Sequence, residues 1–461
     1  MHYEKFQDGT VKCIEDEIPF ELPEGWEWTR LGSVFFTVTG STPSTKDTSL
    51  YGIDYPFYKP ADLDAGYKVF KSESTVSEKG YRSGRPLPPH SVLVTCIGAT
   101  IGKTGYIHNA GICNQQINAI LPNTDILSDY TYFCICSQFE QQQILINSSA
   151  TTLPILNKSK FDNLLFPVPP HEQQLLIVDK IQSMLTLVNK IQDNQEFLKD
   201  KIIATKSKIL DLAIRGELVP QNPDDEPASV LLERIRAEKE ELIKQGKIKR
   251  DKKESVIFKG DDNSYYLRSE SKAIEITNEL PYEIPDSWEW ARIGDVLQVN
   301  PRNKIEDLLE VSFIPMPLID DGFSGKHTSE VRVWEKVKSG FTPFMEGDIG
   351  IAKITPCFEN RKSVVFRNLK NGYGAGTTEL HILRPYASTI LPEYILAYVK
   401  SSMFIGKGKQ EFTGAVGQQR IGKDYVENSC FPIPPFAEQT RIVEQIHIAY
   451  KQLDLISNAL L

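Results

Sequence analysis

Two groups of basic and amide side chains in glycine-rich stretches are the residues of this sequence best suited to bind a ligand. Lysine and arginine neutralise phosphates, while asparagine, glutamine and arginine form paired hydrogen bonds with base edges in the major groove of DNA. The first group is Arg82, Arg85, Lys103, Asn114, Gln115 and Gln116. The second group is Arg302, Asn303, Lys304, Lys353, Arg361, Lys362, Gln418, Gln419 and Arg420. For any one of them alone, a solvated surface position is the simpler interpretation.

Motifs of catalysis are weak by comparison. An adenine methyltransferase needs Asn or Asp before a Pro-Pro-Tyr/Phe sequence, to accept hydrogen bonds from the target amine. The similar stretch Ile433-Pro434-Pro435-Phe436 has isoleucine at that position, which cannot accept them. Residues 372–376 are glycine-rich but lack the strand–turn–helix context of a nucleotide-binding loop, so we expect a turn. No phosphate loop occurs, and the seven histidines form no metal-binding pair. We therefore expect neither a catalytic residue nor a metal site, although a triad assembled from distant residues would leave no such pattern.

Length and composition indicate a globular protein of several domains. The chain has 461 residues, which at roughly 100–200 residues per domain suggests two to four domains. No apolar run reaches the ~20 residues of a membrane span, and no secretion signal precedes residue 20, so we expect a cytoplasmic protein without membrane contact. The seven scattered cysteines fit a reducing compartment. The net charge of −9, taken alone, argues mildly against phosphate binding.

The chain contains an internal duplication. A Trp-Glu-Trp motif occurs at residues 26–28 and again at residues 288–290, and a Pro-x-Pro-Pro motif occurs at residues 167–170 and 432–435. Each pair of motifs bounds roughly 140 residues, the size of one domain. Apolar spacing predicts strands at 91–97 and 362–367, and helices at 130–147 and 391–404. The fold class that follows is α+β, with two mixed α/β domains whose interiors differ.

A heptad pattern follows each Pro-x-Pro-Pro motif. Apolar residues recur at alternating spacings of four and three from Ile177 to Leu212 and from Ile442 to Leu460. This pattern is typical of coiled coils, and the prolines fix where each helix begins. Parallel pairing would crowd the two domains at one end, so we expect an antiparallel pair with pseudo-two-fold symmetry. We expect residues 177–195 to pair with 442–460, which leaves the seam beyond Leu198 without a partner in the chain.

A charged linker separates the two halves. Residues 220–227 are rich in turn formers, and residues 228–245 interleave Glu and Lys at helical spacing. The basic run at 247–253 is interpreted either as a solvated loop or as a phosphate or partner contact. The expected division is therefore 1–170, first domain; 171–216, central helix; 217–280, linker with a charged helix; 281–435, second domain; 436–461, C-terminal helix.

The ordered and doubled motifs resemble the specificity (S) subunit of type I restriction–modification systems over essentially the whole chain. Besides the motifs above, the resemblance includes residues 208–219, 58–63, 97–103, 114–116, 347–348, 352–360 and 376–379. It implies that the two domains are target recognition domains, each reading one half of a bipartite site in double-stranded DNA. It also implies contacts with DNA for some members of both groups of candidate residues.

The resemblance implies that the chain itself is not an enzyme and binds no cofactor. Two modification subunits, which bind S-adenosylmethionine and methylate adenine, would pack on the helices. Restriction subunits would supply ATP- and magnesium-dependent translocation and cleavage. Two alternatives stay open: a self-contained DNA methyltransferase or nuclease, and a coiled-coil scaffold with two peptide-binding domains. The recognised bases do not follow from the sequence, because direct readout depends on the placement of side chains in space.

Overall fold

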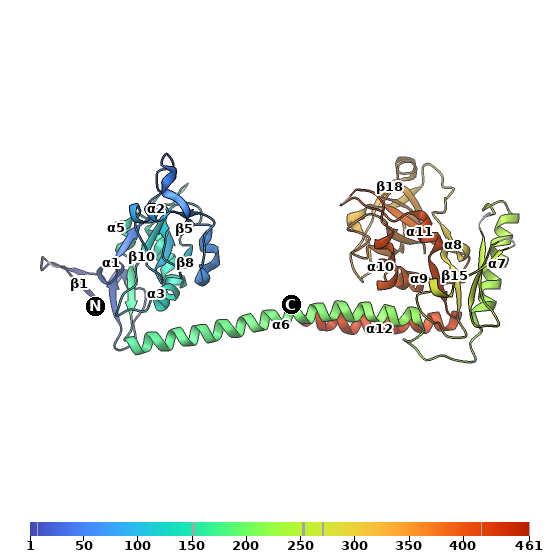
Figure 1. Cartoon of the computed structure of the whole chain (residues 1–461), viewed down its shortest axis with the longest axis horizontal. Coiled ribbons are helices and arrows are strands. Elements are labelled where there is room, and N and C mark those ends of the chain that lie inside the picture. Colours follow the sequence, from blue (N-terminus) through green and yellow to red (C-terminus); the bar gives the residue numbers. More distant parts are fainter. Residues whose placement is uncertain (7, 150–152, 251–253, 270–271, 416, 461) are drawn as a thin grey trace. The chain divides into compact units, whose positions relative to one another are not determined.

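The computed structural model describes residues 1–461 except 7, 150–152, 251–253, 270–271, 416 and 461 (Figure 1). The chain divides into two compact units, Met1–Gln192 and Asp193–Leu461, and each is described by itself. Among the described residues, no helix is both long enough and apolar enough to cross a bilayer.

The first unit is built on small sheets. Its antiparallel four-stranded sheet has the order β4 (Thr37–Thr39), β10 (Ile117–Ile120), β7 (Val92–Thr95) and β8 (Thr104–Tyr106). A second sheet has the order β6 (Thr75–Val76), β5 (Tyr51–Tyr58) and β9 (Ile112–Cys113). Both β7 and β10 are buried along their whole length, as their mostly apolar sequences require. Short helices complete the unit: α1 (Leu31–Val34), α2 (Glu78–Ser83), α3 (Ser128–Ile135), α4 (Gln138–Asn147) and α5 (Lys158–Asp162).

The second unit repeats this plan with different contents. Its matching sheet has the order β16 (Leu297–Val299), β23 (Leu380–Pro385), β20 (Ile349–Ala352) and β21 (Ser363–Val365). A mixed sheet has the order β18 (Glu330–Val333), β17 (Glu310–Ile314), β22 (Tyr373–Gly376) and β19 (Thr342–Met345). The helices are α7 (Ala228–Lys244), α8 (Ile293–Val296), α9 (Pro392–Val399), α10 (Ser402–Gln410) and α11 (Lys423–Asn428).

The repeated motifs pair with each other in both units. Strand β3 (Glu27–Arg30) pairs with β11 (Leu165–Val168), so that Trp28 lies opposite Pro167. In the same way β15 (Glu289–Arg292) pairs with β24 (Cys430–Ile433), so that Trp290 lies opposite Pro432. The start and end of each repeat are therefore joined in one two-stranded ribbon. This closure explains why the two motifs recur together.

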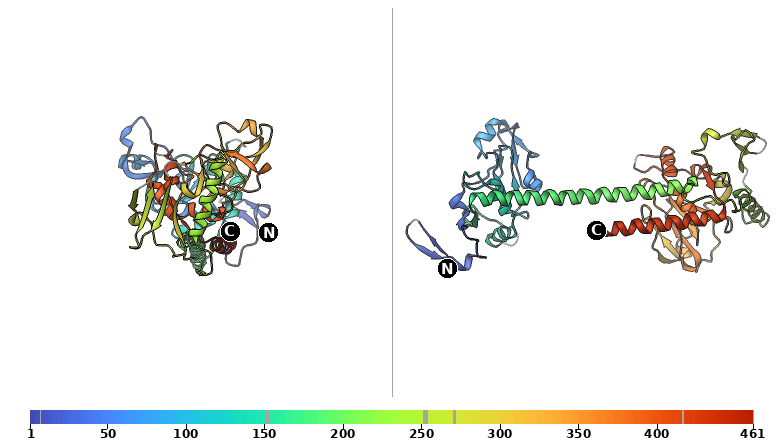
Figure 2. Two further views of the ribbon diagram at one scale, coloured as in Figure 1. Left: turned by 90° about the vertical axis from the view of Figure 1, so that its right-hand side faces the viewer. Right: turned by 90° about the horizontal axis from the view of Figure 1, so that it is seen from below.

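Two long helices follow the ribbons, as the heptads predict. Helix α6 (His171–Arg215) and helix α12 (Phe436–Ala459) each begin directly after a Pro-Pro pair. They lie side by side in Figures 1 and 2 and run in opposite directions. Tyr450 donates a hydrogen bond to the carbonyl of Lys206 at 3.0 Å, and Lys206 pairs with Asp454 at 2.5 Å.

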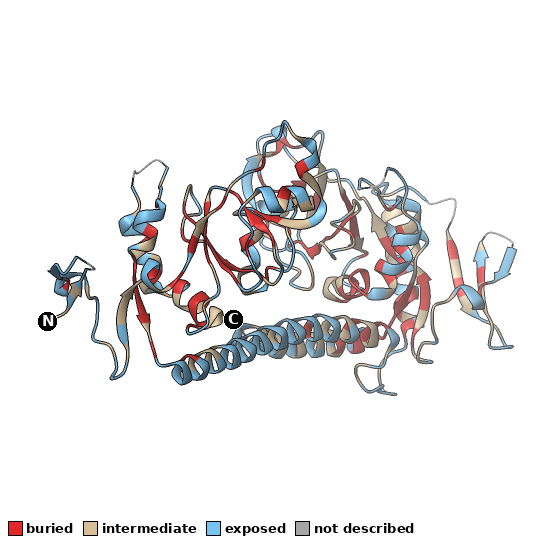
Figure 3. Cartoon of the chain, turned by 60° about the vertical axis from the view of Figure 1, so that its left-hand side comes forward, coloured by how far each residue is buried: buried red, intermediate tan, exposed pale blue. Residues whose placement is uncertain are grey.

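The register differs from the one expected. Helix α12 contacts the C-terminal part of α6, where Leu210, Ala213 and Ile214 are buried. A helix that begins beside the end of α6 and runs backward covers that end first, and its 24 residues span about half of the 45 in α6. The expected pairing of residues 177–195 with 442–460 is therefore wrong. The exposed part of the seam is its first half, from Met184 to Leu198 (Figure 3).

Other expectations need smaller corrections. The stretches 130–147 and 391–404 each form two short helices instead of one, because Ser137 and Ser401 start a new helix by accepting hydrogen bonds from Glu140 N and Phe404 N. Residues 373–376 form strand β22 rather than a turn. The linker contains a three-stranded sheet as well as α7: β12 (Ser255–Lys259), β13 (Tyr265–Ser269) and β14 (Lys272–Glu275). In the basic run, Arg250 pairs with Glu240 at 2.6 Å, and residues 251–253 lie outside the described residues.

Candidate nucleic-acid interface

In the first unit, loops from distant parts of the chain meet at one end of the four-stranded sheet. The backbone N–H of Cys96 donates to the carbonyl of Gln116 at 2.7 Å, and that of Gly40 donates to the carbonyl of Ile117 at 2.9 Å. A side chain on Gly40 would lie 2.1 Å from the carbonyl oxygen of Asn114, so only glycine allows this approach. The segments 40–42, 96–98 and 114–116 therefore form one loop cluster beside β7 and β10.

Several members of the first candidate group belong to this cluster. Asn114 is buried and donates to Gln116 Oε1 at 2.9 Å, while Gln115 is exposed and accepts a hydrogen bond from Thr42 Oγ1. Arg85 reaches the cluster by donating from Nη1 to the carbonyl of Thr39. The exposed amide of Gln115 is the side chain here that is freest to meet a ligand.

The other two members of the group are held elsewhere in the unit. Arg82 pairs with Glu78 one helical turn away, at 2.6 Å, and is largely exposed. Lys103 pairs with Asp64 at 2.5 Å. Each pair has at least one exposed side chain, so it contributes little to stability. The cation of either pair can therefore leave its carboxylate and bind a phosphate instead.

A cavity of about 420 Å³ opens beside the cluster and contains residues that the two candidate groups miss. It is lined by Thr42, Thr45, Tyr51, Phe57, Lys59, Ser74, Thr75 and Asn114. Lys59 donates to Ser74 Oγ at 2.7 Å and lies over the ring of Phe57 at 5.3 Å. Lys59 directly follows the tyrosine- and phenylalanine-rich stretch 51–58, and this neighbourhood is the sequence signal that could have pointed to the site.

In the second unit the equivalent loops bring together Lys353, Gln418, Gln419 and Arg420. The N–H of Lys353 donates to the carbonyl of Glu379 at 3.0 Å, and the N–H of Thr355 donates to the carbonyl of Gln419 at 2.9 Å. Leu380 pairs with Ala352 in the second unit, and Ile117 pairs with Thr95 at the equivalent place in the first unit. Glu379, which precedes Leu380, is therefore the equivalent of Gln116, which precedes Ile117. The same end of the same sheet therefore carries a different set of side chains.

Glu379 is the polar partner at the centre of this second cluster. Its two carboxylate oxygens accept from Arg420 Nε at 2.8 Å and Nη2 at 3.0 Å. Hydrogen bonding to the Arg420 guanidinium lowers the pKa of Glu379, so the pair is ionised at neutral pH. Glu379 was absent from the candidate residues, since a carboxylate alone does not predict binding to a polyanion.

The remaining candidates of the second unit do not join this cluster. Arg361 donates from Nε to the carbonyl of Lys400 at 2.9 Å and lies over the Phe323 ring, and burial lowers its pKa. Lys362 pairs with Asp321 at 3.5 Å. Asn303 accepts from Arg384 Nη2 at 2.9 Å, while its neighbours Arg302 and Lys304 are exposed.

Comparisons with known proteins connect this arrangement to a family. Residues 23–197 match the family model described as the type I restriction modification DNA specificity domain. The type I restriction enzyme EcoAI specificity subunit of Escherichia coli is 48% identical over 236 residues, which cover 51% of this chain and 37% of that protein. The EcoEI specificity subunit of the same organism is 47% identical over the same shares. The chain thus spans about 37% of the length of these two relatives.

Other relatives match over nearly the whole chain. The EcoDI specificity subunit of Escherichia coli is 23% identical over 95% of this chain and 84% of its own length. The crystal structure of the HsdS subunit from Thermoanaerobacter tengcongensis shares the fold with a TM-score of 0.53 at 16% identity, covering 96% of this chain and 94% of that one. A chain from a structural study of the assembly of the type I R-M system gives a TM-score of 0.57 at 17% identity with the same coverage. In its specificity domain, its relatives and its fold, the chain is similar to the specificity (S) subunits of type I restriction–modification systems.

Proposed function

We propose that this chain reads a bipartite site in double-stranded DNA and directs adenine methylation and ATP-dependent restriction by partner subunits. The observation that carries the proposal is the repeated loop cluster. In both units the same end of a four-stranded sheet presents loops, but Asn114, Gln115 and Gln116 in one are replaced by Thr377, Thr378 and Glu379 in the other. A repeated scaffold with different side chains suits two readers of two different half-sites.

The side chains of the clusters have the chemistry for this task. Gln115 and Gln418 are exposed amides, which can form paired hydrogen bonds with adenine. Arg420 and Lys353 supply cations for guanine or for phosphate. Three candidates are bound to other residues of the unit by hydrogen bonds or an ion pair: Asn303, Arg361 and Lys362. In this proposal they stabilise the unit, and the DNA contacts come from Arg302, Lys304 and the cluster.

The finer architecture is also part of the proposal. Residues 1–170 and 281–435 form two target recognition domains in a pseudo-two-fold arrangement, and residues 171–216 and 436–461 form an antiparallel coiled coil. Residues 217–280 link the halves through α7 and the β12–β13–β14 sheet. The opposite directions of α6 and α12 and the shared ribbon of each repeat support this division.

The partners and cofactors follow from the family's division of labour. Two modification subunits carry S-adenosylmethionine, restriction subunits carry the ATP and magnesium sites, and this chain contributes recognition in the cytoplasm, where the DNA lies. The exposed half of the α6 seam offers a surface for the modification subunits, since Met184, Val188 and Ile191 are each about half exposed.

Methylation mapping tests the proposal directly. The chain is expressed with modification subunits in a host that lacks adenine methylation, and methylated adenines are read across the genome. We expect one bipartite motif with two defined halves and an unspecified gap. A continuous motif, or methylation that continues when this chain is omitted, would contradict the proposal.

A further inference from the structure

A half-buried tyrosine fills the corner between α3 and α6 in the first unit. The hydroxyl of Tyr67 donates a hydrogen bond to Asp129 and accepts one from Gln182 Nε2 at 3.0 Å. Its ring stacks on Phe133, with centroids 5.4 Å apart, and contacts Tyr132 at the same centroid distance. This phenol therefore joins α3 to α6 through both its hydroxyl and its ring.

The internal repeat identifies the same corner in the second unit. Gln174 of α6 accepts a hydrogen bond from Leu127 N, just before α3, at 2.8 Å. Gln439 of α12 accepts one from Leu391 N, just before α9, at 2.9 Å. These matching contacts align α3 with α9 and α6 with α12, residue by residue. The equivalents of the four residues around Tyr67 are Glu393 for Asp129, Leu396 for Tyr132, Ala397 for Phe133 and His447 for Gln182.

In the second unit this corner is a cavity of about 490 Å³, and all four equivalent residues line it. Smaller side chains account for part of the space, because Leu396 and Ala397 replace two aromatic rings. Phe323 follows β17 by nine residues, as Tyr67 follows β5, but it lies against Tyr450 with centroids 5.9 Å apart. The groups equivalent to those that hold the phenol therefore line a cavity in which no tyrosine of this unit takes its place.

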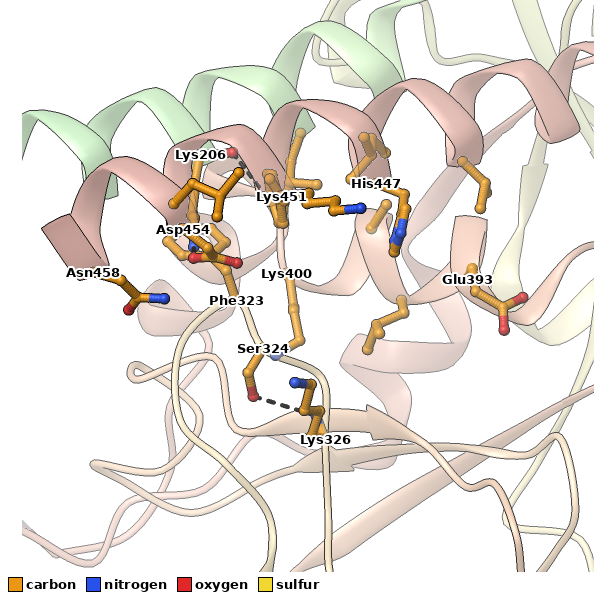
Figure 4. A pocket seen from close by; sticks show the side chains of 17 residues that line it. Lys206, Phe323, Ser324, Lys326, Glu393, Lys400, His447, Lys451, Asp454 and Asn458 are labelled. Atoms are coloured by element: carbon orange, nitrogen blue, oxygen red, sulfur yellow. Dashed lines mark hydrogen bonds and ion pairs between the residues drawn. The ribbon is translucent and has the colours of Figure 1, made fainter.

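Hydrogen-bonding groups remain at the two equivalent polar positions. Glu393 of α9 and His447 of α12 lie on the same side of the cavity (Figure 4). One carboxylate oxygen of Glu393 accepts from Arg367 at 2.6 Å, which leaves the other oxygen for a second donor. The exposed ring of His447 has an N–H donor in either tautomer. A hydroxyl in this corner therefore meets one acceptor and one donor, as the hydroxyl of Tyr67 does.

The rim of the cavity is cationic. In the described part of the chain, the ammonium groups of Lys326 and Lys451 are exposed and have no hydrogen-bond or ion-pair partner. The two carboxylates of the lining, Glu393 and Asp454, are each already paired with a cation. The uncompensated charge at the rim is therefore positive, which favours an occupant whose acidic groups lie just outside the cavity.

We propose that the cavity binds a tyrosine side chain from an acidic segment of a partner polypeptide. The phenol hydroxyl donates to Glu393 and accepts from His447, and its ring lies on α9 as the ring of Tyr67 lies on α3. Acidic residues on either side of the tyrosine meet Lys326 and Lys451 at the rim. The ring leaves water while its hydroxyl keeps both hydrogen-bond partners. Nothing in this contact depends on the proposed reading of DNA.

A pentapeptide with one tyrosine between two pairs of glutamates is the probe. It is added to the full chain with isotope-labelled methyl groups, and the NMR signals of Leu396, Val443 and Ile446 report on the cavity. We expect these signals to shift during the titration. The same peptide with phenylalanine in place of tyrosine should bind about tenfold more weakly, because it lacks the hydroxyl. Unshifted signals at millimolar peptide, or equal binding of the two peptides, would overturn the proposal.

Two substitutions of His447 form a matched pair that tests the hydrogen bond. His447→Gln reproduces Gln182 of the first unit and should bind the tyrosine peptide within about threefold of the unsubstituted chain. His447→Leu removes the donor and should weaken binding about tenfold. Because His447 is exposed, both variants should keep the fold. Equal binding by the two variants would show that the hydroxyl is not held as that of Tyr67 is, and would overturn the proposal.

Free p-cresol, which is the ring and hydroxyl of tyrosine without a backbone, separates the phenol from its acidic neighbours. It should shift the same methyl signals but bind about tenfold more weakly than the peptide, because it has no charge to meet the rim. Lys326→Glu combined with Lys451→Glu should weaken the peptide about tenfold and leave p-cresol within about twofold. If p-cresol bound the unsubstituted chain as tightly as the peptide does, the cavity would be a site for a free phenol, and the proposal of a partner polypeptide would be overturned.

Discussion

Glu379 and Arg420 form a two-pronged ion pair through Arg420 Nε and Nη2, at 2.8 and 3.0 Å. Arg420 Nη1 donates a third hydrogen bond to the carbonyl of Gln418 at 2.8 Å. A guanidinium has five N–H donors, so one remains on each Nη atom. Arginine pairs with O6 and N7 of guanine through two such N–H donors. Glu379 is therefore a positioning residue for Arg420.

The substitution Arg420→Lys should relax specificity at one base pair of the half-site read by the second unit. Lysine keeps the charge but loses the fork, so we expect a cost of about 1–3 kcal/mol at that base pair and little change in salt dependence. Glu379→Gln should act at the same base pair with a smaller effect, because it leaves the guanidinium in place but frees its orientation. Competition binding with single-base variants of the target, using the assembled complex, measures both.

Lys423→Ala is the matched control for this pair, since Lys423 is also an exposed cation paired with a carboxylate, Glu427, at 2.5 Å. It should leave the base preference unchanged. Equal losses at every base pair after Arg420→Lys would assign Arg420 to phosphate contact instead of base reading.

Val188→Ser combined with Ile191→Ser should weaken assembly with the modification subunits without unfolding the chain. Both side chains are about half exposed, and exposed substitutions usually change stability by no more than about 0.5 kcal/mol. Titration calorimetry with purified modification subunit measures the affinity, and Lys190→Ala on another face of α6 is the control. Unchanged affinity would place the modification subunits on a different surface.

The lone chain should bind its target weakly. Its net charge of −9 opposes the approach of DNA, and cations from partner subunits would offset it. Gel shifts with and without modification subunits compare the two states at one salt concentration. Tight, specific binding by the chain alone would contradict this expectation.

The sequence predicted the repeat and the starts of the long helices, because both depend on local signals. Proline cannot continue a helix backward, and so His171 and Phe436 begin α6 and α12. The helix register was not predictable from the heptads, since every heptad offers the same apolar seam. It is set at the helix ends, where Glu438 accepts from Trp288 Nε1 at 2.9 Å and from Gln221 at 2.6 Å.

The break in the first helical stretch, at Ser137, left a readable signal. Ser137 is followed three residues later by Glu140, the spacing of a capping box, and its side chain accepts from the Glu140 N–H at 3.3 Å. Apolar periodicity continued across the break and concealed it. A search for caps inside long periodic stretches would have found this boundary.

The candidate site was only partly readable from residue types. Lys353 and Arg420 are 67 positions apart and meet because a bridge between Ile354 and Arg420 joins their segments. Arg361 is also a cation in a candidate stretch of the sequence. Its backbone has a φ of 55°, and its guanidinium points into the unit, where it donates to the carbonyl of Lys400. The direction of a cationic side chain is a tertiary property, and no local pattern encodes it.

The stability of the second unit should rise with pH above neutrality because of Lys400. Burial lowers the pKa of Lys400 to about 7, from 10.5 for a free lysine. Its Nζ donates to the carbonyls of Gly322 and Arg361 inside the wall of a cavity of about 490 Å³ beside α12 (Figure 4). Between pH 7 and 10 the unfolded chain binds more protons at this site than the folded chain, so the free energy of unfolding increases with pH.

Lys400→Met removes this titration. We expect its unfolding free energy, measured in urea at pH 7, 8 and 9, to have a flatter pH dependence than that of the unsubstituted chain. The absolute value is not diagnostic, because the two carbonyls lose their donor at the same time. Lys451→Met, in the same cavity wall, is the control. Parallel pH profiles for Lys400→Met and the unsubstituted chain would show that Lys400 is protonated throughout.

Replacing amides in one loop cluster should alter one half-site and leave the other unchanged. Gln115 lies in the first cluster, and Gln418 and Gln419 lie in the second, on separate sheets with separate cores. Since distant substitutions act independently, Gln115→Ala should cost about 1–3 kcal/mol at a base pair of one half-site. Gln418→Ala and Gln419→Ala should do so only in the other half-site. Methylation mapping of each variant, assembled with its partner subunits, reads both halves in one experiment. If each variant degraded both halves equally, the two units would not be independent readers, and a single shared DNA surface would have to replace them.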